Sequence, residues 1–230
     1  MTKEALFFAV SPLKSLASRE KFDYVRPMYF QERTSLILEL GFNEAALPKL
    51  KSYIDLLWSA NEELNLISRK MTFEELIDNH IIDSLLPLKS FPANIKAAAD
   101  FGSGGGLPAV IYAIQFPHIK YHLYEKSPKK QEFLTRCKAI APNLEIHGEI
   151  PKELKGIDLV TARGFKPIDV ILDVSRDYYK NGGKYFLLKA RKEKIDEELV
   201  LATKKFKDLK VKVEPLKSPV LDVERHLVLI

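Results

Sequence analysis

The 230-residue sequence has little of what marks proteins that work outside the reducing interior of a cell. It contains one cysteine, Cys137, so no disulfide can form within the chain. No apolar run approaches the ~20 residues that cross a bilayer. The apolar stretch 5–10 is too short for the core of a good signal peptide. We therefore expect a cytoplasmic protein with no membrane segment.

Patterns for several kinds of catalysis are also missing. No Cys/His cluster has the spacing of a zinc site, so we expect no bound metal. No catalytic dyad or triad is evident. Cys137 lies at helical spacing from Phe133, which favours a thiol packed in the core over a nucleophile.

The composition is that of an ordinary globular protein, with 46% hydrophobic and 29% charged residues and a net charge of +5. The charge is unevenly spread. Residues 126–138 carry five basic residues and one acidic residue, a net +4, and residues 191–212 carry eight basic and five acidic residues, a net +3. Clusters of this kind suit a polyanionic partner, and they are equally typical of solvated helix faces.

The hydrophobic period changes along the chain. Between residues 31 and 88 apolar residues recur at spacings of three and four, which predicts helices. One such face comprises Leu47, Leu50, Tyr53, Ile54, Leu57 and Trp58. Thr72 followed by Glu75 predicts a capping box at the start of a helix.

From residue 93 onward short apolar runs alternate with helical stretches. We expect strands near 95–101, 119–125, 143–147, 157–161, 182–189, 209–214 and 225–230. We expect helices near 107–116, 127–140, 167–179 and 192–207. Repeated β–α–β units predict an α/β fold with a Rossmann-like, mostly parallel sheet. The last two strands should form an antiparallel edge.

The predicted organisation has three parts. Residues 1–30 form an N-terminal extension, residues 31–92 a helical segment, and residues 93–230 the α/β domain. We expect the helical segment and the α/β domain to make one compact unit.

The most informative segment is the glycine-rich stretch 100–108, Asp-Phe-Gly-Ser-Gly-Gly-Gly-Leu-Pro, which follows the first predicted strand of the α/β region. Ligands of such sheets bind at the carboxyl ends of strands, and glycine lets the backbone approach them closely. The dinucleotide pattern G-x-G-x-x-G fails from Gly102, because position 107 is leucine, and from Gly104, because position 109 is alanine. A phosphate-binding P-loop also fails, since no Gly-Lys-Ser/Thr follows.

The remaining pattern, acidic-x-Gly-x-Gly-x-Gly, resembles the S-adenosylmethionine loop of Rossmann-like methyltransferases. That cofactor has no pyrophosphate and needs no phosphate cradle. Glu125 ends the second predicted strand 23 residues after Gly102. An acid at about 20 residues from the loop accepts hydrogen bonds from ribose hydroxyls, so Glu125 is a candidate cofactor ligand.

Several further stretches are similar to the GidB/RsmG family of 16S rRNA guanine-N7 methyltransferases. They are Trp58 to Leu66, His80 to Leu85, Asp100 to Pro108, Lys129 to Leu134, Thr161 to Arg163, Leu188-Lys189 and Glu224 to His226. Each is short, but their order and spacing extend from about residue 36 to residue 230.

The resemblance implies roles for particular residues. It places Gly102, Gly104, Gly106 and Leu107 around S-adenosylmethionine, and Gly148 and Glu149 near its adenine. It places Arg163 beside the methionyl side of the cofactor or at the mouth of the active site. It implies methylation of a guanine in 16S rRNA, with the free RNA or the small ribosomal subunit as partner. We expect the chain to act as a monomer.

The residues themselves suggest how such a reaction would run. Guanine N7 has an available lone pair, so no obligatory general base is expected and the enzyme mainly aligns the reactants. Arg163 and Lys189 end predicted strands and are candidates for the catalytic site. His80 and Asp83 share a helix face and are candidates too, although a structural hydrogen bond that anchors the helical segment to the α/β core explains them somewhat better. Lys129, Lys130 and Arg225 are candidate RNA contacts.

Three other functions are compatible with parts of the sequence. A methyltransferase acting on a small molecule or a protein would keep the glycine loop and Glu125 but need no basic surface. A non-catalytic RNA-binding or assembly factor would keep the fold without consuming the cofactor. A nicotinamide dehydrogenase is opposed by the failed dinucleotide pattern.

Overall fold

A computed structural model describes residues 28–230 of the chain. Seven strands form one sheet in the order β3–β2–β1–β4–β5–β7–β6. The strands are β1 (Ala97–Phe101), β2 (Lys120–Tyr124), β3 (Leu144–His147), β4 (Leu159–Arg163), β5 (Tyr185–Lys189), β6 (Lys212–Leu216) and β7 (Arg225–Leu229). The pairs among β1 to β5 are parallel, and β7 runs antiparallel to both β5 and β6. The predicted sheet with its antiparallel C-terminal edge is confirmed. The predicted extension, residues 1–30, lies almost wholly outside the described residues.

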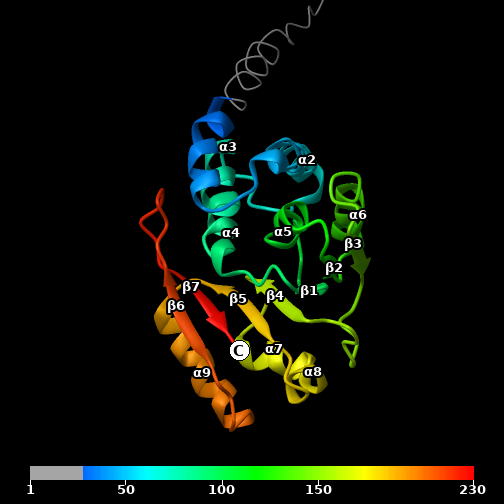
Figure 1. The fold of residues 1–230 in the computed structure, drawn as a ribbon, viewed down its shortest axis with the longest axis vertical. Helices are drawn as coiled ribbons and strands as arrows, with labels where there is room; N and C mark the ends of the chain where they lie inside the picture. The colour runs from blue at the N-terminus through cyan, green and yellow to red at the C-terminus, as the bar shows by residue number, and fades with distance from the viewer. Residues whose placement is uncertain (1–27) are drawn as a thin grey trace, which may run out of the picture.

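Helices cover both faces of the sheet (Figure 1). One side carries a helix over residues 28–39, α2 (Leu47–Leu64), α3 (Phe73–Leu76), α4 (Asp83–Leu85), α5 (Ala109–Gln115) and α6 (Pro128–Cys137). The other side carries α7 (Ile168–Val174), α8 (Arg176–Lys180) and α9 (Lys192–Lys205). Short 3-10 turns lie at Glu44–Ala46 and Leu88–Ser90. Within residues 28–230 no helix is both long and apolar enough to cross a membrane.

The segment predicted as one helix over 167–179 forms two helices, because the helical conformation is interrupted at Ser175. Its buried hydroxyl donates to the carbonyl of Ile171 at 2.7 Å and lies 2.8 Å from the hydroxyl of Tyr185. Serine bonded back to the preceding turn bends helices, and here α7 ends and α8 begins at that residue. The last-but-one strand is also displaced from the prediction and runs from Lys212 to Leu216.

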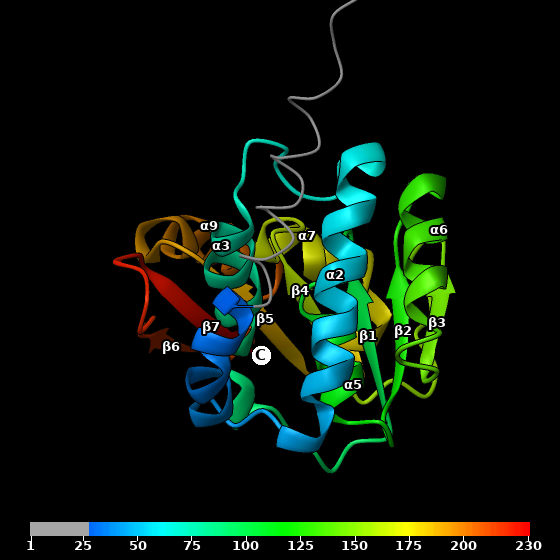
Figure 2. The ribbon, with the colours of Figure 1, turned by 90° about the horizontal axis from the view of Figure 1, so that it is seen from above.

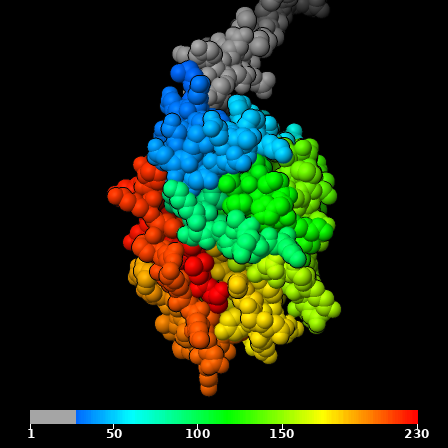
Figure 3. Space-filling view, in the orientation of Figure 1, coloured from blue at the N-terminus to red at the C-terminus, as the bar shows by residue number. Residues whose placement is uncertain are grey.

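The helical segment packs on the α/β core through the predicted face of α2. Leu50, Tyr53, Ile54 and Leu57 are fully buried, and α2 contacts α5 and α6. Figure 2 shows α2 lying over the sheet next to α5, and Figure 3 shows the segment, blue to cyan, resting directly on the green elements. One continuous hydrophobic cluster runs from this segment to the strands.

A second contact fixes the helical segment to the glycine loop. The buried hydroxyl of Tyr53 donates to the carbonyl oxygen of Gly105 at 2.6 Å.

Thr72 and Glu75 form the predicted capping box, with Thr72 Oγ1 accepting from Glu75 N and Glu75 Oε2 accepting from Thr72 N. The helix that follows contains a π-helical stretch at Ile77–Ile82, a departure from α geometry that is frequent at functional sites.

Two tyrosine-to-phenylalanine substitutions should distinguish a buried hydroxyl that donates a hydrogen bond from a buried hydroxyl that has no partner among the described residues. Tyr53→Phe leaves the buried carbonyl of Gly105 without its donor and should lower the free energy of unfolding by about 1–3 kcal/mol. The hydroxyl of Tyr121 is buried and has no hydrogen-bond partner among the described residues, so Tyr121→Phe should be neutral or stabilising. Urea unfolding of the two variants checks this, and equal losses would contradict it.

Candidate active site

The glycine loop between β1 and α5 requires glycine at particular positions. Gly102, Gly104 and Gly106 have positive φ angles of 69°, 54° and 84°. A Cβ at Gly102 would lie 2.3 Å from the ring of Phe165, and one at Gly106 would lie 2.5 Å from a methyl of Val110. Backbone conformation therefore disfavours side chains at all three positions, and close packing also opposes them at Gly102 and Gly106.

The N–H groups of this loop bond within the protein. Those of Gly102 and Ser103 donate to the carbonyl of Tyr124, and that of Gly106 donates to Ser103. The N–H of Gly104 donates to Glu125 Oε2 at 2.9 Å. N–H groups that already donate within the protein are not free to bind a phosphate. This agrees with the predicted cofactor, S-adenosylmethionine, which has no phosphate.

Glu125 links the glycine loop to the start of α6. Its second carboxylate oxygen accepts from the N–H of Ser127 at 2.9 Å. A carboxylate oxygen has two lone pairs, so both oxygens of Glu125 can accept a further bond. Glu125 lines a small cavity of about 260 Å³ together with Gly102, Tyr124, Lys126, Lys130, Gly148, Ile150, Gly164 and Phe165.

Asp100, the acid before the glycines, lies in the core of the sheet. It is 1% exposed and accepts from the hydroxyl of Thr161 at 2.6 Å. Burial raises the pKa of Asp100 to about 7, although the bonds from Thr161 and Ser103 and the charge of Arg163 oppose this.

Asp83 is the centre of an ion network that joins three parts of the fold. Its Oδ2 accepts from Arg163 on β4 at 3.2 Å, and its Oδ1 accepts from Nε of Arg225 on β7. The Asp83 side chain is 8% exposed. Burial lowers the pKa of Arg163, and Asp83 opposes this shift. One carboxylate between two guanidinium groups leaves the network with a net positive charge.

His80 extends this network one helical turn earlier. Its Nδ1 lies 2.9 Å from a guanidinium nitrogen of Arg163, which can only donate, so Nδ1 accepts and the proton of the neutral ring sits on Nε2. Burial, with the charges of Arg163 and Arg225, lowers the pKa of His80 to about 4. The Nε2 atom is buried and has no partner among residues 28–230, so a donor stands ready for a ligand.

Lys189 at the end of β5 is held by a second ion pair. Its ammonium donates to Glu198 at 2.7 Å and to the carbonyl of Lys166 at 2.8 Å. The same oxygen of Glu198 accepts from the N–H of Ile168 at the start of α7. Lys189 is thus fixed between β5, α7 and α9.

These groups line one cleft of about 700 Å³. Its walls include Asn79, His80, Asp83, Arg163, Gly164, Phe165, Lys189, Glu198, Arg225 and His226. Gly164 and Phe165 also line the small cavity over the glycine loop. The cleft therefore brings together all four predicted catalytic residues and adjoins the predicted cofactor loop.

The remaining predicted residues lie around these two hollows. Gly148 and Lys130 line the small cavity, and Lys129 is exposed on α6. Glu149 is 81% exposed and pairs with Lys126 at 3.4 Å. Leu107 is buried in the hydrophobic core.

Cys137 is a packed thiol, as predicted. It is fully buried, and burial raises its pKa to about 12, so it is not a thiolate nucleophile at neutral pH.

Sequence reasoning missed Tyr53, Phe165 and Glu198 as residues that shape the site. Glu198 could have been found, because it lies on the same face of α9 as buried Ile195 and Ala202, where an acid needs a partner. No local pattern marks Phe165, which reaches the glycine loop from the turn after β4.

Comparison with known proteins identifies the family. A family model described as rRNA small subunit methyltransferase G matches residues 46–228. The chain belongs to the rRNA small subunit methyltransferase G family. Ribosomal RNA small subunit methyltransferase G 1 of Bdellovibrio bacteriovorus is 74% identical over 202 residues, which cover 88% of this chain and 98% of that protein. A relative from Borrelia garinii is 34% identical over 80% of this chain and 89% of its own.

The architecture recurs in more distant proteins. A solved structure of a candidate O-methyltransferase from Klebsiella pneumoniae superposes with a TM-score of 0.55 at 12% identity, covering 89% of this chain and 97% of that chain. At this identity the likeness shows a shared fold.

Removal of the network's carboxylate should destabilise the protein. Asp83→Ala leaves two part-buried guanidinium groups without their anion and should lower the free energy of unfolding by about 3–5 kcal/mol. Asp55→Ala, which breaks an exposed pair with Lys51, should change it by less than about 0.5 kcal/mol. Similar losses in the two variants by urea unfolding would disprove the central role of Asp83.

The buried acid before the glycines predicts a pH dependence of stability. The folded-state pKa of Asp100 is raised to about 7 from 3.8. The stability that this group contributes is therefore present below its pKa in the unfolded state and is lost as the pH rises toward 7. Asp100→Asn should therefore gain stability relative to the unsubstituted protein between about pH 4.5 and about pH 8. Unfolding measured at both pH values checks this, and a difference that stays constant would refute it.

Proposed function

We propose that this chain transfers a methyl group from S-adenosylmethionine to N7 of a guanine in the 16S rRNA of the small ribosomal subunit. The proposal rests on one observation above all. A loop shaped by obligatory glycines adjoins a positively charged cleft through Gly164 and Phe165. Membership of the rRNA small subunit methyltransferase G family supports the substrate class.

The residues around the small cavity fit the cofactor. Gly102, Gly104 and Gly106 keep the loop free of side chains, and Glu125 would accept hydrogen bonds from ribose hydroxyls. Gly148 would lie near the adenine, with Glu149 beside it. Leu107 would act indirectly, because it is buried behind the loop.

The cofactor supplies a methyl group made electrophilic by a sulfonium ion. Guanine N7 offers a lone pair without prior loss of a proton, so the protein has to align the base and exclude water. The proton on Nε2 of His80 would bond to an acceptor on the base, because His80 lines the cleft and this buried donor has no partner among the described residues. His80 would then position the base.

The arginines and Lys189 would receive the RNA. Arg163, Arg225 and Lys189 all line the cleft. Lys129 and Lys130 extend the basic surface along α6 toward the cofactor cavity. Phosphate contacts of this type give a binding affinity that falls as the salt concentration rises.

We place this activity in the cytoplasm and in a monomer.

Labelling of the RNA tests the function directly. Undermodified small subunits would be incubated with the protein and radiolabelled S-adenosylmethionine, and the label mapped by borohydride–aniline cleavage, which detects N7-methylguanine. Label at one guanosine of 16S rRNA is expected. Cofactor binding without RNA labelling would overturn the proposal in favour of another methyl acceptor or a non-catalytic assembly role.

His80→Ala should separate base positioning from cofactor binding. Loss of one bond made to the reacting base should lower kcat by about 10²–10³-fold, while the Kd for S-adenosylmethionine changes little. His118→Ala, at an exposed position in the turn between α5 and β2, should leave both unchanged. Equal kcat values for the two variants would exclude a role of His80 in the reaction.

A further inference from the structure

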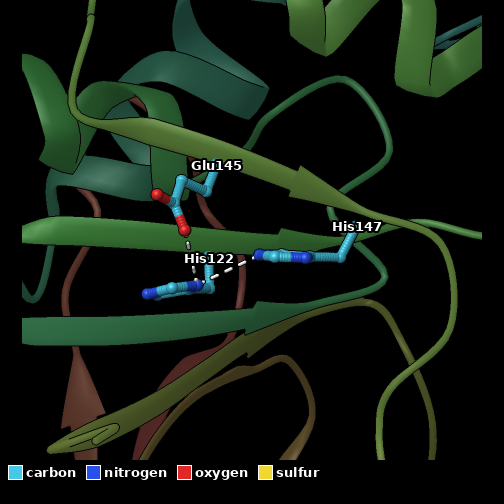
Figure 4. A group of neighbouring side chains, drawn as sticks. All are labelled: His122, Glu145 and His147. Atoms are coloured by element: carbon cyan, nitrogen blue, oxygen red, sulfur yellow. Dashed lines mark hydrogen bonds and ion pairs between the residues drawn. The ribbon is translucent and has the colours of Figure 1, made fainter.

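A cluster of three side chains on β2 and β3 is unexplained by the proposed reaction. His122 lies on β2, and Glu145 and His147 lie on the neighbouring edge strand β3. In the parallel register His122 is paired with Glu145, and His147 is two residues further along, so all three side chains share one face of the sheet. Figure 4 shows them converging above the strands.

The distances between their polar atoms are short. Nδ1 of His122 lies 3.0 Å from Nε2 of His147 and 3.3 Å from Oε2 of Glu145. Each residue offers a ligand atom, and these atoms all lie within 4.8 Å of one another. Ligand atoms on a tetrahedral zinc ion stand ~3.3 Å apart, as follows from Zn–N and Zn–O distances near 2.0–2.1 Å.

The surroundings leave this face open and hold the ligands in place. Residues 148–158, which join β3 to β4, contain no helix. The side chains of His122 and Glu145 are accordingly 19% and 40% exposed. Lys120 holds the other oxygen of Glu145 at 2.7 Å, and the ring of Tyr124 stacks on His147 with centroids 4.9 Å apart.

The donor set selects the class of metal. Two imidazole nitrogens with one carboxylate favour zinc and its neighbours over magnesium or calcium, which prefer oxygen alone.

We propose that His122, Glu145 and His147 bind one Zn²⁺ ion, with water completing a tetrahedral coordination. Among residues 28–230 these three form the only group of His, Cys, Asp or Glu with this geometry. Residues 1–27 contain no histidine or cysteine. Three protein ligands and an open fourth position are the arrangement of an accessible zinc site.

The ion would cross-link two strands beside the proposed cofactor cavity. The carbonyl of His147 accepts from the N–H of Glu125, and Gly148 follows at once in the chain. Binding of the ion to the folded state alone would raise the stability of the protein. The site itself does not depend on the proposed methyl transfer.

Cobalt(II) is a direct probe, because tetrahedral Co²⁺ absorbs visible light far more strongly than octahedral Co²⁺. The full chain, treated with a chelator, would be titrated with Co²⁺ and then with Zn²⁺, without cofactor or RNA. One equivalent of Co²⁺ should give the intense tetrahedral spectrum, and Zn²⁺ should abolish it by displacement. A weak octahedral spectrum, or none, would overturn the proposal.

Matched histidine variants locate the site. His122→Gln and His147→Gln should each weaken binding at least about tenfold, since loss of second-shell partners alone has effects of that size. His118→Gln removes an exposed histidine outside the cluster and should bind metal as the unsubstituted protein does. Circular dichroism without metal establishes that each variant is folded, and Glu145→Gln replaces any that is not. Unchanged binding in His147→Gln, or binding lost in His118→Gln, would contradict the assignment.

Discussion

The carboxylate of Asp83 is the interaction on which the geometry of the cleft depends. It comes from the helical segment, and its two partners come from β4 and from β7, which is 142 residues away in sequence from Asp83. Both arginines are part-buried, so an anion between them offsets the cost of removing their charges from water. The carboxylate of Asp83 thus joins the helical segment to the sheet and holds the two positively charged arginines together in the cleft.

The network also decides what His80 can do. Because a guanidinium group of Arg163 occupies Nδ1, the proton of the imidazole must lie on Nε2. The low pKa of His80, about 4, keeps the ring neutral throughout the physiological range. A neutral donor at fixed orientation suits alignment of a base, whereas it would serve poorly as a proton acceptor.

Much of the fold could be predicted from the sequence, because its elements follow from local patterns. The change from helical to strand spacing near residue 93 gave the α/β class, and the glycine stretch located the loop. The break at Ser175 escaped prediction, since it depends on how the Ser175 hydroxyl bonds, back to Ile171 and to Tyr185 on β5. The site was predicted in part. Arg163, Lys189, His80 and Asp83 do line one cleft, but their pairing could not be read from spacing, and Arg225 is bonded to Asp83 as well as facing the cleft.

The contacts that could not be predicted join residues that lie far apart in the sequence. Phe165 reaches Gly102, and Tyr53 reaches Gly105, only because the chain folds back on itself. His122 and His147 likewise come from two strands separated by α6, so no spacing rule for metal ligands finds them. The residues whose roles are set by contacts across the sheet are those that sequence patterns leave unmarked.

A double-mutant cycle on methyl transfer tests the central claim, that Asp83 and Arg225 act as one unit in framing the cleft. The values of kcat/KM would be measured for Asp83→Asn, Arg225→Gln and the double variant with undermodified small subunits. If the pair acts as a unit, the losses are not additive, and the coupling energy is about 0.5–3 kcal/mol. Additive losses, with a coupling energy near zero, would show that the two residues act independently and would contradict this account.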